Sequence, residues 1–177
     1  MSAAKERMIR YLHEHFIPFT ECCGGGVPHI HLLYQHYDYC PDRALESSMY
    51  FHENTIESSV YYTRSGRNFC QNSEHRDGLL QVLNYLNASV WPAVSGGVLY
   101  QTSQLYTSRF YMTEEFDICC KTLVPYDFFD LAPSETADYL TAACPDLLNE
   151  LSFYLFCVLL GQSDAETVIR VLKNSDL

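Results

Sequence analysis

Two histidines separated by a single residue, His29 and His31, are the clearest candidates for chemistry in this sequence. Their surroundings are typical of a strand, in which residues two apart point to the same face. His36, Cys22 or Cys40 could supply a third ligand to a metal held there. However, any such pair in a strand shares a face, and the sequence has neither a Cys-x-x-Cys pair nor a His-x-x-x-His pair. We therefore favour a surface strand without a metal, and keep a small metal- or thiol-dependent enzyme using His29, His31 and a Cys as an alternative.

The other motifs that could carry catalysis are incomplete. The glycine run 24–26 lacks the following Lys-Ser/Thr of a phosphate-binding loop, so we expect a turn there. A nucleophilic cysteine needs a nearby histidine or a helix N-terminus, and Cys144, which precedes Pro145, could lie near a helix start. With eight Cys and seven His in the chain, chance proximity is common, and we interpret Cys144 as an inert buried thiol. No catalytic residue and no cofactor is predicted.

The charge of the chain limits its partners. Eleven Lys and Arg stand against 22 Asp and Glu, which gives a formal net charge of −11. Such a charge repels phosphate backbones and anionic membrane surfaces, so we expect neither nucleic-acid nor membrane binding. A basic or amphipathic partner is favoured, although many soluble proteins are acidic merely to remain dispersed.

Signals for export or membrane insertion are missing from the sequence. The first seven residues contain no apolar core of signal-peptide length, and the longest uncharged apolar run, 151–161, is shorter than the roughly 20 residues of a membrane span. The chain is also large enough to fold without disulfides, so we interpret the eight cysteines as reduced thiols. We expect a cytoplasmic protein.

Aromatic side chains occur on the polar sides of the predicted strands. The chain has 14 tyrosines, and Tyr50, Tyr61 and Tyr111 lie opposite the apolar stripes of their strands. Arg109, two residues before Tyr111, shares its face of the strand. Tyrosine buries a broad ring while its hydroxyl stays in water, which suits a recognition surface and equally a half-covered sheet. If the surface binds a partner, we expect Tyr50, Tyr61, Arg109 and Tyr111 to contact it.

The segment that follows Pro145 predicts a helix that is apolar on nearly every side. Such a helix lies in the centre of a core or is shared with a second subunit. A homodimer is therefore a hypothesis, with an interface at Tyr154, Phe156 and Leu159.

The periodicities predict the order helix, strands, helix, strands, helices. The expected elements are a helix 4–16, extended segments 17–22 and 29–38, a hairpin of 47–52 with 56–62, a polar loop 64–72, a helix 74–88 capped by Ser73, strands 98–102, 105–113 and 116–124, a helical segment ending at 143, a helix from 145 to about 160, and a last helix 163–173 with a capping box at 163–166. This order indicates an α+β fold, an antiparallel sheet with helices on one face, forming a single domain over 1–177 with the last helix as an addition.

The element order and two stretches, LLQVLNYLN at 79–87 and RFYMTEE at 109–115, resemble the YbjN-domain proteins. These are bacterial proteins described as sensory-transduction regulators, and they share the fold of type III secretion chaperones. The resemblance spans most of residues 4–160. The chain departs from the pattern by its extra helix after Gly161 and by its many Cys and Tyr residues.

The resemblance implies a role without catalysis, because secretion chaperones of this fold are small, acidic and dimeric and hold unfolded segments of partner proteins. We therefore expect a non-enzymatic module that binds a protein or peptide, chaperone-like or regulatory, as a homodimer. Besides the metal- or thiol-dependent enzyme, a small-molecule sensor with a pocket between sheet and helix remains an alternative. Fold analogy alone does not establish a function.

Overall fold

A computed structural model of the chain describes residues 3–24, 27–88, 93–95, 98–100 and 108–174. The helices and helical turns are α1 (Ala3–Glu14), η1 (Pro41–Arg43), α2 (Arg64–Asn72), α3 (Arg76–Ala88), α4 (Tyr126–Leu131), α5 (Pro133–Asp138), η3 (Tyr139–Ala143), α6 (Cys144–Leu159) and α7 (Ala165–Asn174). The strands are β1 (Thr20–Gly24), β2 (Val27–Gln35), β3 (Ala44–Phe51), β4 (Thr55–Tyr62), β5 (Ala93–Ser95), β6 (Val98–Tyr100), β7 (Ser108–Met112) and β8 (Ile118–Pro125).

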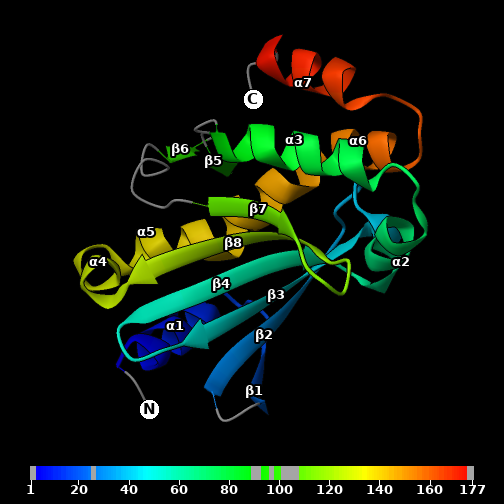
Figure 1. Cartoon of the computed structure of the whole chain (residues 1–177). Helices are drawn as coiled ribbons and strands as arrows, with labels where there is room; N and C mark the ends of the chain where they lie inside the picture. The colour runs from blue at the N-terminus through cyan, green and yellow to red at the C-terminus, as the bar shows by residue number, and fades with distance from the viewer. Residues whose placement is uncertain (1–2, 25–26, 89–92, 96–97, 101–107, 175–177) are drawn as a thin grey trace.

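Six strands form one antiparallel sheet in the order β1-β2-β3-β4-β8-β7, while β5 and β6 pair separately (Figure 1). Every neighbouring pair is antiparallel, so the predicted α+β fold with an antiparallel sheet is confirmed. The expected strands 98–102 and 105–113 lie partly outside the described residues, and their described parts are β6 and β7.

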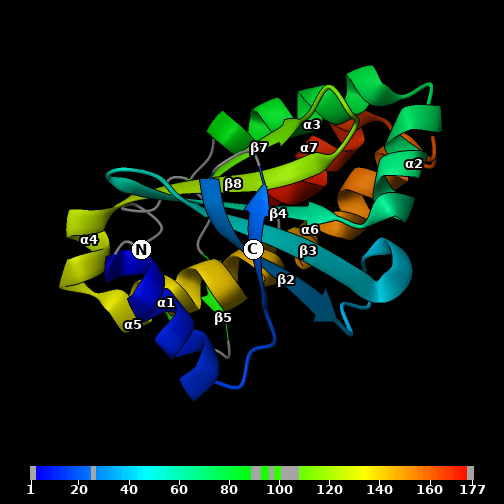
Figure 2. The same cartoon turned by 90° about the horizontal axis from the view of Figure 1, so that it is seen from below.

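Side-chain alternation divides the sheet into two faces. Along β4, Ile56, Ser58, Val60 and Tyr62 are buried, and the residues between them are only half-buried. The buried set packs into one hydrophobic core that also includes residues of α1, α3, α6 and α7. Seen from below in Figure 2, α1 and α5 lie on one side of the sheet, and α3 runs along its β7 edge. The core therefore lies between the sheet and this helical layer.

The prediction of a polar loop at 64–72 is wrong, because these residues form α2. This helix buries only Gly66 and Cys70, which are too small to produce a recognisable apolar stripe in the sequence. Gly66 lies against Tyr62 so closely that a Cβ built on the glycine would be 2.3 Å from the tyrosine Cβ. A small residue is what allows α2 to pack on the end of β4.

The helical segments around Pro145 form one continuous helix, Pro133–Leu159, rather than two separate ones. A π turn, η3, precedes Cys144 and leads into α6, where Pro145 occupies the first turn. Proline cannot donate the usual backbone hydrogen bond, and the π turn, in which the hydrogen-bonding pattern changes, lies just before it.

By length and composition alone this continuous helix could cross a membrane, which the shorter run seen in the sequence could not. However, 56% of its most apolar window is buried inside the protein, as in the core helix of a soluble protein. The cytoplasmic location stays a prediction.

Polar side chains bind backbone groups near the starts of two helices. Ser73 was predicted to cap α3, but the N–H whose hydrogen bond it accepts, at 3.0 Å, belongs to His75, one residue before that helix begins. Its hydroxyl donates to the carbonyl of Leu159, the last residue of α6, at 2.6 Å. At α7 the cap is Asp164, whose carboxylate accepts from the Thr167 N–H at 2.7 Å, rather than Ser163 of the predicted capping box.

An asparagine side chain closes the β7 edge of the sheet. The Asn87 amide of α3 donates to the Phe110 carbonyl at 2.6 Å, and its carbonyl oxygen accepts from the Phe110 N–H at 2.7 Å. One side chain thus makes both hydrogen bonds that a neighbouring strand would make, at a strand edge where such groups are otherwise open to pairing.

We expect Asn87→Asp to lower the free energy of unfolding by about 1–3 kcal/mol. The substitution keeps the shape of the side chain but places a carboxylate oxygen against the Phe110 carbonyl oxygen, where the amide donor had been. Urea unfolding measures the loss. The control is Asn84→Asp, at an exposed position on the same helix, which should change stability by less than about 0.5 kcal/mol. Equal losses in the two variants would contradict the edge-closing role.

Candidate functional site

The face of the sheet opposite the core is the first candidate surface, and we call it the open face. In Figure 1, α1 lies behind the strands, and no described helix lies in front of β2, β3 and β4. Across five strands, the outward residues of the open face are His29, His31, Leu33, Glu46, Ser48, Tyr50, Glu57, Ser59, Tyr61, Arg109, Tyr111, Cys119, Lys121 and Leu123.

Tyr50 stacks with two histidine rings on the open face. The His29 ring stacks on it at 4.7 Å between ring centroids, and the His52 ring stacks at 6.3 Å. His29 and Tyr50 are direct cross-strand partners, which explains why their rings meet. The tyrosine is half-buried, so part of its ring remains available to a partner.

Ion pairs connect the strands next to Tyr50. Glu57, which pairs with Tyr50 across β3 and β4, lies 2.5 Å from the Lys121 ammonium and 3.4 Å from His52 Nε2. The ammonium of Lys121 also lies 5.6 Å from the centroid of the Tyr111 ring. These groups are partly exposed, so each contact adds little stability, but together they fix the side chains in one arrangement.

A second tyrosine covers small residues on the same face. The Tyr61 hydroxyl and the Ser48 hydroxyl share a hydrogen bond of 3.0 Å, and Tyr61 is the cross-strand partner of Cys119. Cys119 is buried although it points away from the core, and this burial raises the pKa of its thiol to about 12. At neutral pH the Cys119 thiol is therefore protonated and a poor nucleophile.

The structure places the four residues expected to contact a partner on the same face of the sheet. Tyr61 and Tyr111 lie in one row across the sheet, on either side of Cys119. On the same face, Arg109 lies in the next row, two residues along β7, and Tyr50 lies in the row after that, on β3. Alternation alone was enough to place all four on one face.

The candidate metal ligands converge only in part. His29 and His31 share the open face as expected, and Cys22 on β1 is the cross-strand partner of His29. However, His31 Nε2 lies 3.9 Å from a Glu46 carboxylate oxygen, and the Cys40 thiol is buried 3.2 Å from the Ser152 hydroxyl of α6. Within the described part of the chain, no group of three or more His, Cys, Asp or Glu side chains could hold a metal ion.

The three residues expected at a dimer interface differ in how far they are buried within the single chain. Phe156 and Leu159 are buried in the core of the single chain, because α6 passes beneath the sheet and α3. Tyr154 is half-buried, while Phe153 of the same helix and Leu160, the residue directly after it, are exposed. The homodimer itself stays a prediction.

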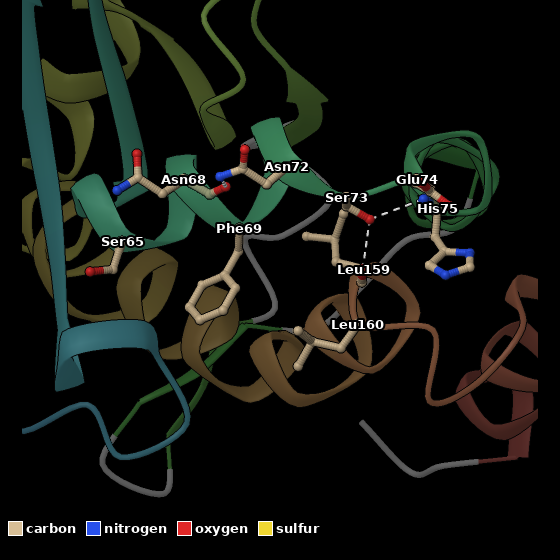
Figure 3. A pocket seen from close by; sticks show the side chains of 9 residues that line it. All are labelled: Ser65, Asn68, Phe69, Asn72, Ser73, Glu74, His75, Leu159 and Leu160. Atoms are coloured by element: carbon tan, nitrogen blue, oxygen red, sulfur yellow. Dashed lines mark hydrogen bonds between the residues drawn. The ribbon is translucent and has the colours of Figure 1, made fainter.

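A hollow of about 690 Å³ lies between α2, the start of α3 and the end of α6. Figure 3 shows the Phe69 ring and the Leu160 side chain in it, with Ser73 hydrogen-bonded to His75 and Leu159. Sequence reasoning missed this hollow because α2 was interpreted as a loop, and its walls come from segments far apart in the chain. The predicted sensor pocket was placed between sheet and helix, whereas this one lies between helices.

Comparisons of the chain with protein-family models, with curated proteins and with solved structures find no match. The resemblance to YbjN-domain proteins therefore stays an expectation.

Proposed function

We propose that this protein is a non-enzymatic module that binds a protein or peptide on the open face of its sheet. The observation that carries the proposal is the composition of that face. A sheet face that only meets water is covered mainly by long charged side chains, whereas this one combines tyrosine and histidine rings with small residues such as Ser48 and Ser59. Rings above small residues are typical of recognition surfaces.

The rigidity of the open face supports binding. Tyr50 stacks with two histidine rings, and Tyr61 is hydrogen-bonded to Ser48, so both rings are ordered before a partner arrives. Side chains that are already ordered lose less conformational entropy on binding. The net charge of −11 favours a partner with basic or amphipathic character. A chaperone-like or regulatory role of YbjN type, as a cytoplasmic homodimer, belongs to the same proposal and rests on the resemblance.

We expect the double variant Tyr50→Ala, Tyr61→Ala to reduce partner capture at least about tenfold. The two substitutions remove ordered ring surface from β3 and β4, the middle strands of the open face, and large aromatic side chains contribute most to an interface. The measurement is affinity purification of the tagged full chain from its native cell, with bound proteins quantified by mass spectrometry. Thermal unfolding of the variant must show that the sheet remains folded.

A tyrosine outside the open face provides the control. Tyr39 is 63% exposed, and its backbone N–H is bound to Asn149 of α6 on the helical side of the molecule. Tyr39→Ala should leave capture unchanged. Undiminished capture by the double variant, or an equal loss with Tyr39→Ala, would remove the open face as the binding surface.

The hollow between α2, α3 and α6 supports a second candidate function, a sensor of a small molecule. Its volume is in the range of small-molecule sites, and its lining combines Phe69 and Leu160 with polar Asn68, Asn72 and Glu74. A thermal-shift screen of small molecules distinguishes the two functions. A hit that Phe69→Ala abolishes, while the Tyr50→Ala, Tyr61→Ala variant retains it, would favour the sensor.

A further inference from the structure

A second hollow adjoins the one between α2, α3 and α6. It has a volume of about 380 Å³ and lies between the first half of α3, the end of α6 and the start of α7. Glu74 and His75 line both hollows, so the two form one groove, which we call the helical groove. In Figure 3, Glu74 and His75 lie at one end of the first hollow, beyond Phe69 and Leu160.

The first hollow gives the helical groove an apolar end. Phe69 of α2 is 46% exposed, and Leu160, the residue directly after α6, is 50% exposed. The Phe69 ring is fixed from below by the buried Phe156 ring, which it meets edge-on at 5.9 Å between centroids. A ligand that covers these two side chains removes apolar surface from water, which favours binding in a concave site.

The second hollow gives the helical groove an acidic end. Four carboxylates line it, those of Glu74, Asp77, Asp164 and Glu166. Among the described residues that line either hollow, none is Lys or Arg. Asp164 accepts a hydrogen bond from the Thr167 N–H. The other three carboxylates have neither a hydrogen bond nor an ion pair within the described part of the chain.

The arginines of the neighbouring helices are bound to other groups. Arg76 of α3 donates to the Gln71 carbonyl at the end of α2, at 2.6 Å. Arg170 of α7 donates to the Thr167 hydroxyl at 3.4 Å and acts electrostatically on one carboxylate of the groove, Asp164. The remaining negative charge of the second hollow is therefore available to a cation that a ligand brings.

We propose that the helical groove binds a small organic amine, with its aromatic or alkyl part against Phe69 and Leu160 and its ammonium group among the carboxylates of the second hollow. This inference rests on the sensor function proposed for the first hollow and names the class of its ligand. The carboxylates form no group that could hold a metal ion within the described residues, whereas attraction to an organic cation acts over a longer range. The two volumes together fit a ligand with an apolar part and a charged end.

The test is calorimetric titration of the full chain with three probes that share one apolar part and differ in charge: phenylbutylamine, phenylbutanol and phenylbutyrate. We expect the amine to bind about tenfold more tightly than the alcohol, and the carboxylate to bind more weakly than either. Added salt should weaken binding of the amine and leave binding of the alcohol unchanged, because salt screens only the charged contact.

Two double variants connect this preference to the helical groove. Glu74→Gln with Glu166→Gln removes two of its carboxylates and should raise the Kd of the amine about fivefold without changing that of the alcohol. The unchanged Kd of the alcohol shows that the variant is folded. Glu53→Gln with Glu114→Gln makes the same change in net charge at exposed positions outside the groove, and it should change the Kd of the amine less than about twofold. Equal losses in the two double variants would overturn the proposal.

The remaining outcomes separate the ligand class from the site itself. Alcohol and amine binding equally well would overturn the inference of an amine and leave a small-molecule site in the first hollow. No binding by any of the three probes would overturn the inference and the sensor function together. A short peptide with Phe beside Lys, blocked at both ends, is the fourth probe. If it binds tenfold or more tightly than phenylbutylamine, the occupant is a protein segment and not a small amine.

Discussion

Gly66→Ala should destabilise the fold by about 3 kcal/mol or more, the largest loss that we expect from adding one methyl group. The new Cβ would lie 2.3 Å from Tyr62 Cβ and 3.1 Å from Tyr62 Cγ. The position of the Tyr62 Cβ is set by the backbone, so a rotamer change cannot relieve the overlap with it, and α2 must move away from β4. The Phe156 ring, 3.6 Å from the same point, limits that movement. Chemical denaturation of purified protein measures the loss.

The matched control is Gly78→Ala, in the first turn of α3. There the nearest atom to the new Cβ is a terminal methyl carbon of Val158 at 3.1 Å, which can shift by a few tenths of an ångström. Alanine also gains about 1 kcal/mol over glycine within a helix, which offsets the closer contact. We expect a change of less than about 1 kcal/mol. A Gly66→Ala protein as stable as the Gly78→Ala protein would show that α2 does not pack on β4 in this way.

The two faces of the sheet were predictable because strand alternation is a local property. Alternation along the strand puts Ser58 on the same face as Ile56 and Val60, and it is buried with them. Adjacent residues of a strand point to opposite faces, and Cys120 lies in the core while Cys119 pairs with Tyr61 outside it. The period of two in a strand decides these positions without knowledge of any tertiary contact.

Features built from distant segments were not predictable in the same way. Nothing in the residues around Asn87 indicates that it meets Phe110, 23 positions later, and the Ser108 and Cys144 contact spans 36 positions. The helix α2 escaped prediction because its burial relies on Gly66 and Cys70, whose small side chains carry almost no periodic signal. Such contacts form only when the complete fold brings the elements together.

The aromatic residues of α6 were the most ambiguous part of the sequence, since an all-round apolar helix fits both a monomer core and a subunit interface. The structure shows, residue by residue, which side chains of α6 are buried within the single chain and which are exposed. Phe156 is 9% exposed, and its ring meets Tyr62 edge-on at 4.9 Å and Phe69 at 5.9 Å between centroids. Phe153, three residues earlier, is 60% exposed.

Phe156→Ala should therefore lower the free energy of unfolding by about 3–5 kcal/mol, because it leaves a cavity between α6, β4 and α2. The loss should be the same at low and high protein concentration, since the cavity forms within one chain. Phe153→Ala, on the exposed side of the same helix, should change stability by less than about 0.5 kcal/mol. Denaturant unfolding at two protein concentrations measures both variants. If Phe156→Ala loses stability only on dilution, and sedimentation shows that it turns a dimer into a folded monomer, then Phe156 belongs to an interface between subunits and not to the core of one chain.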